Sequence, residues 1–138
     1  MISQNHMKKF SWSKAIGYGV FMWIIMAALV WLASYIGIMG YLLTQIVLVV
    51  LAFMFAYGFS LNILFTSGEQ AFGYGIAFII VGFILDLVFT TTLYPALFSM
   101  WAYWTAYLAI LIAPMIESTS AEQTRIRAHS HMNFHSSV

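Results

Sequence analysis

Asp86 is the one formal charge within a long apolar segment, in the run Ile84–Val88. An ionised carboxylate inside a bilayer is costly, and intramembrane acids commonly mark functional sites. No Lys, Arg or His lies deep inside a predicted span. We therefore expect neutral hydrogen-bond donors, water or another subunit beside Asp86, or a carboxyl that remains protonated.

Candidate donors follow from helical spacing and from depth in the membrane. Thr90 is the expected nearest neighbour, because residues at i and i+4 share one face of a helix. Gln45 in the second span, and Trp104 and Thr105 in the fourth, complete the predicted intramembrane polar site around Asp86. Further donors at comparable depth are Trp31, Ser34, Tyr35 and Thr44.

The composition excludes a soluble domain. Of 138 residues, 63% are hydrophobic, 18% aromatic and 7% charged, whereas soluble domains carry about 25% charged residues. The chain has no cysteine, which removes thiolate chemistry and cysteine metal sites. Its net charge of +1 indicates no nucleic-acid partner. We predict an integral membrane protein whose immediate partner is the lipid bilayer.

The apolar region predicts an all-α four-helix bundle. Residues 15–68 carry no formal charge and are long enough to cross a bilayer twice, with a break at Gly37–Gly40. Pro95 marks another boundary, because proline can begin a helix. Apolar runs such as Ile46–Ala56 lack the alternation of a membrane strand. The predicted spans are 13–36, 41–65, 71–93 and 95–116, between an N-terminal segment, 1–12, and a polar tail, 117–138.

The basic residues predict the orientation. Lys8, Lys9 and Lys14 precede or begin the first span, and Arg125 and Arg127 follow the fourth. Cytoplasmic flanks carry an excess of Lys and Arg. We therefore expect both termini to be cytoplasmic (N-in/C-in), with the protein in the cytoplasmic (inner) membrane.

The two halves of the chain resemble each other. Residues 15–34 and 71–90 align without gaps, with identities that include both glycines and the tyrosine of Gly17-Tyr18-Gly19 and Gly73-Tyr74-Gly75. A duplication would make two helical hairpins related by a parallel repeat. The alternative is coincidence, because Gly and Tyr are both common in membrane proteins.

Small residues predict where helices pack closely. Gly17, Gly19, Gly73 and Gly75 lie in the first turns of the first and third spans. Small side chains allow membrane helices to approach closely. A stripe in the fourth span, with Ala52 and Ala56 in the second as its expected partner, consists of Ser99, Ala102, Ala106, Ala109 and Ala113.

The polar tail offers little chemistry. Thr119–Glu122 fits a capping box, which predicts a short helix through about Arg127. Imidazoles at His129, His131 and His135 have no carboxylate or thiolate beside them, so we expect a solvated tail, no metal site and no cofactor. No Ser-His-Asp set can be assembled at one depth, and we do not expect an enzyme.

Two functions remain open. The first is a structural or accessory subunit, or an assembly factor, of a larger membrane complex, in which Asp86 joins helices or pairs with a partner. The second is a homo-oligomeric proton- or cation-coupled transporter or channel that uses Asp86. A pathway normally needs several polar stations, and the positions adjoining Asp86 are apolar, which favours the first.

Overall fold

The computed structural model describes residues 10–63, 65, 67–90, 92 and 94–136, and these are helical with no strand among them. The elements in chain order are α1 (Trp12–Ile36), α2 (Leu42–Leu61), α3 (Gly68–Leu85), the π-helix η2 (Asp86–Thr90), the 3-10 helix η3 (Pro95–Ser99) and α5 (Trp101–Ser136).

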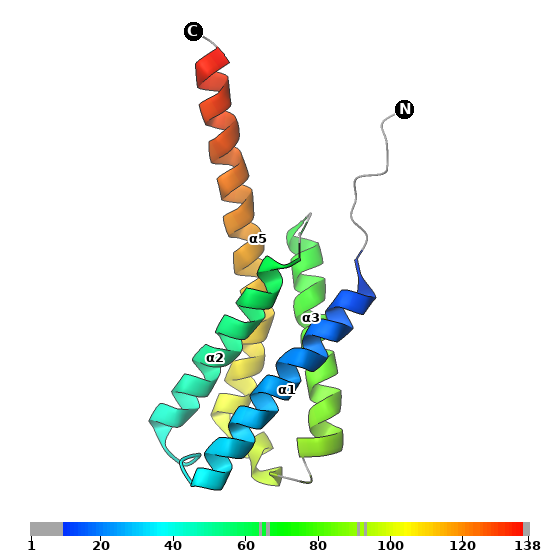
Figure 1. Ribbon diagram of the computed structural model, residues 1–138, viewed down its shortest axis with the longest axis vertical. Helices are drawn as coiled ribbons and strands as arrows, with labels where there is room; N and C mark the ends of the chain where they lie inside the picture. The colour runs from blue at the N-terminus through cyan, green and yellow to red at the C-terminus, as the bar shows by residue number, and fades with distance from the viewer. Residues whose placement is uncertain (1–9, 64, 66, 91, 93, 137–138) are drawn as a thin grey trace.

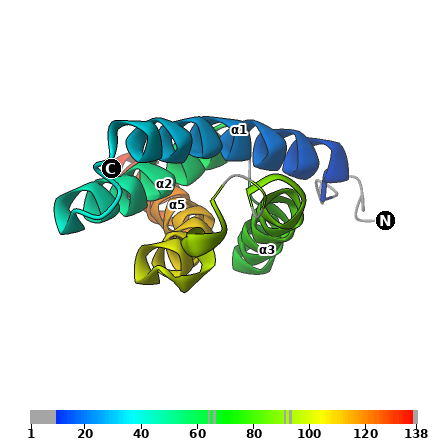
Figure 2. The same ribbon diagram turned by 90° about the horizontal axis from the view of Figure 1, so that it is seen from below.

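The helices form an antiparallel bundle. α1 and α3 run in one direction, and α2 and α5 run in the other (Figure 1). Seen end-on, α5 lies between α2 and α3 (Figure 2), and its contacts with these two helices are the most extensive in the described structure. α1 packs mainly against α3 and more sparsely against α2.

Local signals account for the helix ends. Ser11 and Ser67 cap α1 and α3, each accepting a hydrogen bond from a backbone N–H three residues later. Gly37 ends α1 with φ of 81°, a left-handed conformation that glycine adopts without strain. The predicted break at Gly37 and the first predicted span, 13–36, thus agree closely with α1.

Other boundaries differ from the prediction. α2 ends at Leu61 rather than at residue 65. The third span is not a uniform α-helix, because its last described turn, Asp86–Thr90, is a π-helix. Pro95 begins a 3-10 helix instead of the fourth long helix, which starts at Trp101. A short 3-10 segment thus leads into α5.

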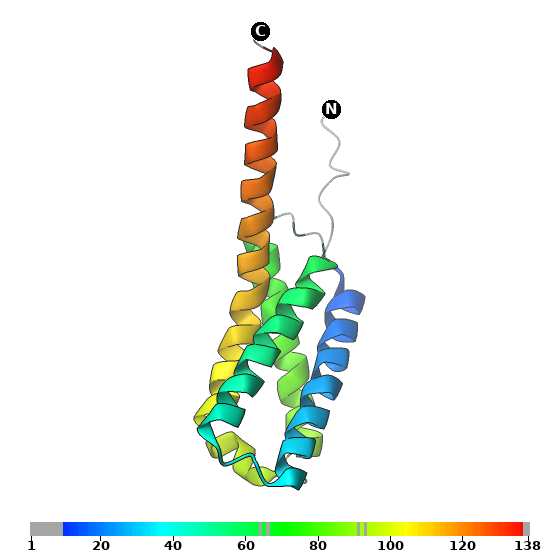
Figure 3. The ribbon, with the colours of Figure 1, turned by 60° about the vertical axis from the view of Figure 1, so that its left-hand side comes forward.

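The polar tail continues α5 as one helix to Ser136, well past the short helix predicted from the capping box. Thr119 does not act as a cap, because its hydroxyl donates to the Met115 carbonyl at 3.0 Å. Pro114 lies inside α5 and is fully buried. The segment beyond Glu117 projects past the other helices (Figure 3).

The small-residue stripe of α5 lies on its buried side. Ala113 is 0% exposed and Ala102 7%, while Ala106 and Ala109 are half-buried. Ser99, the first residue of the predicted stripe, belongs to η3 and is exposed. The expected partners in α2, Ala52 and Ala56, are both 0% exposed and share a core cluster with Ala113.

The four glycines of the repeat have different surroundings. A Cβ added to Gly75 would lie 2.9 Å from the Leu111 carbonyl oxygen of α5, and one added to Gly19 would lie 3.2 Å from Val81 of α3. One added to Gly73 would meet only the Phe10 ring, at 3.4 Å. Gly17 has no neighbour within 4 Å, contrary to its predicted packing role. Aligned glycines therefore serve different contacts, and α3 packs on α5 more extensively than α1 packs on α2.

Three helical segments are long and apolar enough to cross a membrane: Trp12–Ile36, Leu42–Leu61 and Gly68–Thr90. Their outward faces carry large exposed apolar side chains, including Phe21, at 55%, and Ile80, at 53%. Such a surface is typical of a membrane protein, because lipid rather than water can cover it.

Candidate functional site

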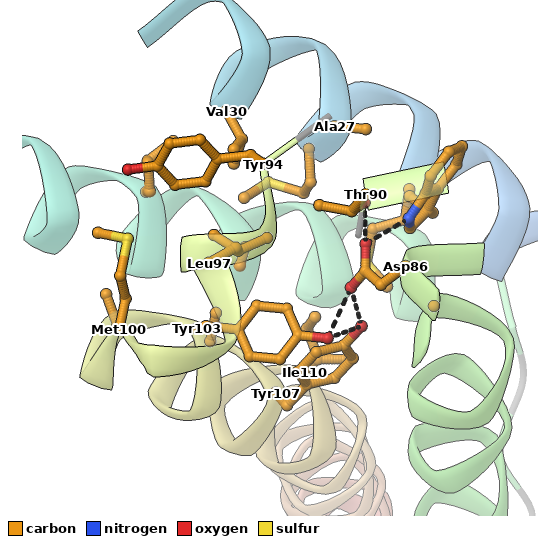
Figure 4. A pocket seen from close by; sticks show the side chains of 18 of the residues that line it. Ala27, Val30, Asp86, Thr90, Tyr94, Leu97, Met100, Tyr103, Tyr107 and Ile110 are labelled. Atoms are coloured by element: carbon orange, nitrogen blue, oxygen red, sulfur yellow. Dashed lines mark hydrogen bonds between the residues drawn. The ribbon is translucent and has the colours of Figure 1, made fainter. Parts of the chain in front are cut away.

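Asp86 lies where α3 changes into η2. Asp86 is only 7% exposed, and its carboxylate faces the space between α1, α3 and α5 (Figure 4). π-Helical turns are rare and are frequently found at functional sites. The unusual backbone therefore coincides with the one formal charge of the apolar region.

Four neutral side chains donate hydrogen bonds to this carboxylate (Figure 4). Oδ1 accepts from the indole Nε1 of Trp23 at 2.7 Å and from Oγ1 of Thr90 at 2.8 Å. Oδ2 accepts from the phenol oxygens of Tyr103 at 2.9 Å and Tyr107 at 2.5 Å. We call these five residues the Asp86 cluster. It joins α1, the α3–η2 helix and α5 through a single carboxylate.

The hydrogen-bond pattern satisfies both carboxyl oxygens of Asp86 without a basic side chain. A carboxylate offers about four lone-pair positions to hydrogen-bond donors. Two donors lie within hydrogen-bond distance of each oxygen. The described basic side chains lie far along the helices, with Lys14 in the first turn of α1 and the others beyond Glu117 in α5.

The local sequence explains how the donors converge. Tyr103 and Tyr107 are one turn apart on α5 and therefore share a face. Gly82 lies one turn before Asp86 on α3, and a Cβ added there would approach the Tyr107 phenol oxygen to 3.2 Å. The absence of a side chain at Gly82 thus makes room for the Tyr107 phenol beside Asp86.

The structure brings one of the predicted neighbours to Asp86. Thr90 donates to it, as the i+4 spacing predicts. The other three are placed elsewhere: Gln45 donates to the Met39 carbonyl at 3.3 Å, Trp104 to the Phe98 carbonyl at 3.0 Å and Thr105 to the Trp101 carbonyl at 2.9 Å. These residues were predicted because their expected depth in the membrane is similar to that of Asp86. In the structure their donor groups bond to nearby backbone carbonyls instead.

Sequence reasoning missed Trp23, Tyr103 and Tyr107. The tyrosines adjoin the small-residue stripe, because Tyr103 and Tyr107 directly follow Ala102 and Ala106, but they lie about 100° further round α5. Trp23 had no such signal. The repeat aligns Asp86 with Val30, which lies about two turns beyond Trp23 on α1. Trp23 comes close to Asp86 because α1 crosses the bundle obliquely (Figure 1).

A cavity of about 150 Å³ adjoins the Asp86 cluster. Its walls come from all four long helices and from η2 and η3, and they reach Met39 and Tyr94 at the turn end of the bundle. The lining is mainly apolar, as Val30, Leu97 and Ile110 illustrate (Figure 4). Ser34 also lines it, and the Ser34 hydroxyl oxygen is buried without a hydrogen-bond partner among the described residues.

Comparison with protein-family models, with curated proteins and with solved structures finds no match to this chain. Any functional assignment therefore depends on the site and on the surfaces of the molecule.

Proposed function

We propose that the chain is an integral membrane protein that crosses the bilayer four times, with both termini cytoplasmic. Three segments have the length and hydropathy of spans. The apolar first part of α5 packs between α2 and α3 and would supply the fourth. Basic residues at both ends of the chain support this orientation in the cytoplasmic membrane.

Within that membrane, the chain acts as a structural or accessory subunit, or an assembly factor, of a larger complex. The observation that carries this proposal is the extension of α5 beyond Glu117. In proteins, helices gain most of their stability from packing of an apolar face, and this extension projects past the other helices (Figure 3). Ile126 and Met132 on it are 62% and 69% exposed, which supports contact with a protein partner outside the bilayer.

The Asp86 cluster supports the same role from inside the membrane. Its carboxylate accepts hydrogen bonds from four side chains of this chain, so its oxygens need no basic group of a partner to be satisfied. Asp86 therefore serves to fix α1, α3 and α5 in one arrangement. The bundle anchors the protein, and α5 presents its extension to the partner.

Purification in a mild detergent, followed by native mass spectrometry, tests the accessory role. The full-length chain should be recovered in an assembly of defined composition. A variant that ends at Ser118 should keep its helical spectrum in detergent but lose the partner. A full-length chain that is recovered only as a monomer contradicts the proposal.

A second candidate function is a homo-oligomeric proton- or cation-coupled transporter or channel. The observation in its favour is the cavity beside a charged residue on a π-helix. Its test is proton and cation flux into liposomes, with Asp86→Asn as the comparison, because this change keeps the size but removes the ionisable group. Absent flux, or flux unchanged in Asp86→Asn, excludes it.

A further inference from the structure

The cavity beside Asp86 has the size of a small organic molecule. At about 150 Å³ it matches the volume of an engineered apolar cavity that binds benzene. Its walls include Val30, Leu97 and Ile110 around the space seen in Figure 4. Such walls would bind an apolar body by contact and by removing it from water or lipid.

Among the described residues, the cavity lining contains a negatively charged residue and no positively charged one. Asp86 is the one residue in the lining with a formal charge, and four neutral side chains hydrogen-bond to its carboxylate. Neutral donors stabilise the charge but do not cancel it. In a medium of low dielectric constant the remaining negative field attracts a cation strongly.

The walls favour an organic cation over a metal ion. Hard metal cations require several oxygen ligands, and both Asp86 oxygens already accept two hydrogen bonds. Among the described residues, no three His, Asp or Glu side chains could hold a metal together. The remaining lining is mostly apolar and aromatic.

Aromatic rings surround the carboxylate. Trp23, Tyr103 and Tyr107 line the cavity, and the Phe89 ring lies 5.6 Å from that of Trp23. Ring faces attract organic ammonium groups, and this attraction increases where water is excluded. Each phenol that donates to Asp86 also becomes richer in electrons at its ring. The unpartnered Ser34 hydroxyl offers a separate hydrogen bond to a polar group of a ligand.

From these observations we propose that the cavity binds a small organic monocation, with an ammonium group attached to an apolar body about the size of a benzene ring. The ammonium lies against the aromatic faces beside Asp86, and the body fills the space next to Val30 and Leu97. This binding is independent of the accessory role, because it involves the cavity and not the α5 extension.

Titration of the purified full-length protein in detergent with benzylammonium tests the proposal, with benzyl alcohol as the neutral analogue of matched size. Calorimetry should give saturable 1:1 binding of benzylammonium, at least about tenfold tighter than that of benzyl alcohol. Bound ligand should also raise the thermal midpoint of the protein. Equal affinities would show an apolar hole without cation selectivity, and absent binding of both would also overturn the proposal.

Two variants locate the site. Asp86→Asn should abolish the preference for the cation over the alcohol. Ala27→Leu leaves the Asp86 cluster intact and places a larger side chain in the lining, so it should weaken both ligands while the protein stays folded. Cation binding that Ala27→Leu leaves unchanged would place the ligand elsewhere and contradict the proposal. This second variant also decides the matter if Asp86→Asn does not fold.

Discussion

A carboxylate buried among apolar helices either takes up a proton or accepts a hydrogen bond at each of its lone pairs. Four side chains hydrogen-bond to Asp86, two at each oxygen. The indole and three hydroxyls that donate to it are neutral, so none of them requires a compensating charge. Removal of each donor should therefore have a measurable effect on stability, and the effects are coupled because all four donors share one carboxylate.

Removal of the Thr90 hydroxyl should destabilise the protein. Thr90→Val keeps the shape of the side chain but deletes one bond to a charged acceptor, a loss of about 1.5–3 kcal/mol. Thr105→Val is the matched control, because that hydroxyl bonds within its own helix to Trp101. Reversible unfolding in mixed micelles measures both, and equal losses would contradict a special contribution of the Thr90–Asp86 hydrogen bond.

Removal of the Tyr107 hydroxyl should have a similar effect. Tyr107→Phe deletes one of the two phenols on Oδ2 and leaves Tyr103 in place, so we expect a loss of about 1.5–3 kcal/mol. Tyr35 is 79% exposed and stacks on Trp31, which makes Tyr35→Phe a control that keeps its ring contact. A thermal midpoint of Tyr107→Phe no lower than that of Tyr35→Phe would count against the cluster.

Part of this site could be predicted from the sequence. The charge of Asp86 and the proximity of Thr90 follow from residue type and helical spacing. The tyrosines required knowledge of which face of α5 is buried. Trp23 required the crossing angle of α1 over α3, which depends on packing between segments far apart in the chain.

At the scale of the helices, close contact depends on a few positions without side chains. Gly75 brings the backbone of α3 against that of α5, and Gly19 brings α1 against α3. These contacts set the distances across which the Asp86 cluster forms. Van der Waals contact of this kind is the main source of helix association in membranes.

Enlargement of Gly75 should therefore be harmful. In Gly75→Ala the new methyl group would meet the Leu111 carbonyl oxygen at 2.9 Å, which forces the backbones apart. Overpacking of this kind costs about 1–3 kcal/mol. Gly17→Ala, which meets nothing within 4 Å, should leave the unfolding midpoint unchanged or higher. An equal decrease in both variants would contradict this account, because helix propensity alone favours Ala over Gly and Gly17→Ala meets no neighbouring atom.

The helix ends could be predicted where one residue determines the backbone. Gly37 was such a residue, and α1 ends there. Pro95 was recognised as a boundary, but proline alone does not distinguish a 3-10 turn from the start of an α-helix. The continuation of α5 through residues 117–136 had no hydrophobic period to predict it. The π-helix at Asp86–Thr90 could not be inferred from local propensity, because such turns are rare and have no simple sequence signal.

For the molecule as a whole, the two ends of the bundle carry different segments of the chain. Both turns, at 37–41 and 94–100, lie at one end, and the extension of α5 leaves from the other (Figure 3). The proposed orientation places the turns outside the cell and the extension in the cytoplasm. The cavity reaches the end that carries the turns.

Cysteine labelling should test this orientation, because the chain has no cysteine of its own. In intact cells, a membrane-impermeant maleimide should label Gly40→Cys and should not label Thr119→Cys until the membrane is opened. Ile80→Cys, on the outward face within α3, should stay unlabelled in both conditions. Labelling of Thr119→Cys in intact cells would overturn the proposed orientation. Reporter fusions at both termini provide an independent check.

The π-helix at Asp86–Thr90 also has an evolutionary consequence. A π turn spans one residue more than an α turn, so a single codon separates the two states of this helix. Deletion of Val88, whose side chain is 60% exposed, would return the segment to ordinary α geometry and leave the residues on either side nearly in register. The clamped carboxylate could thus have arisen in a plain membrane helix by one in-frame insertion.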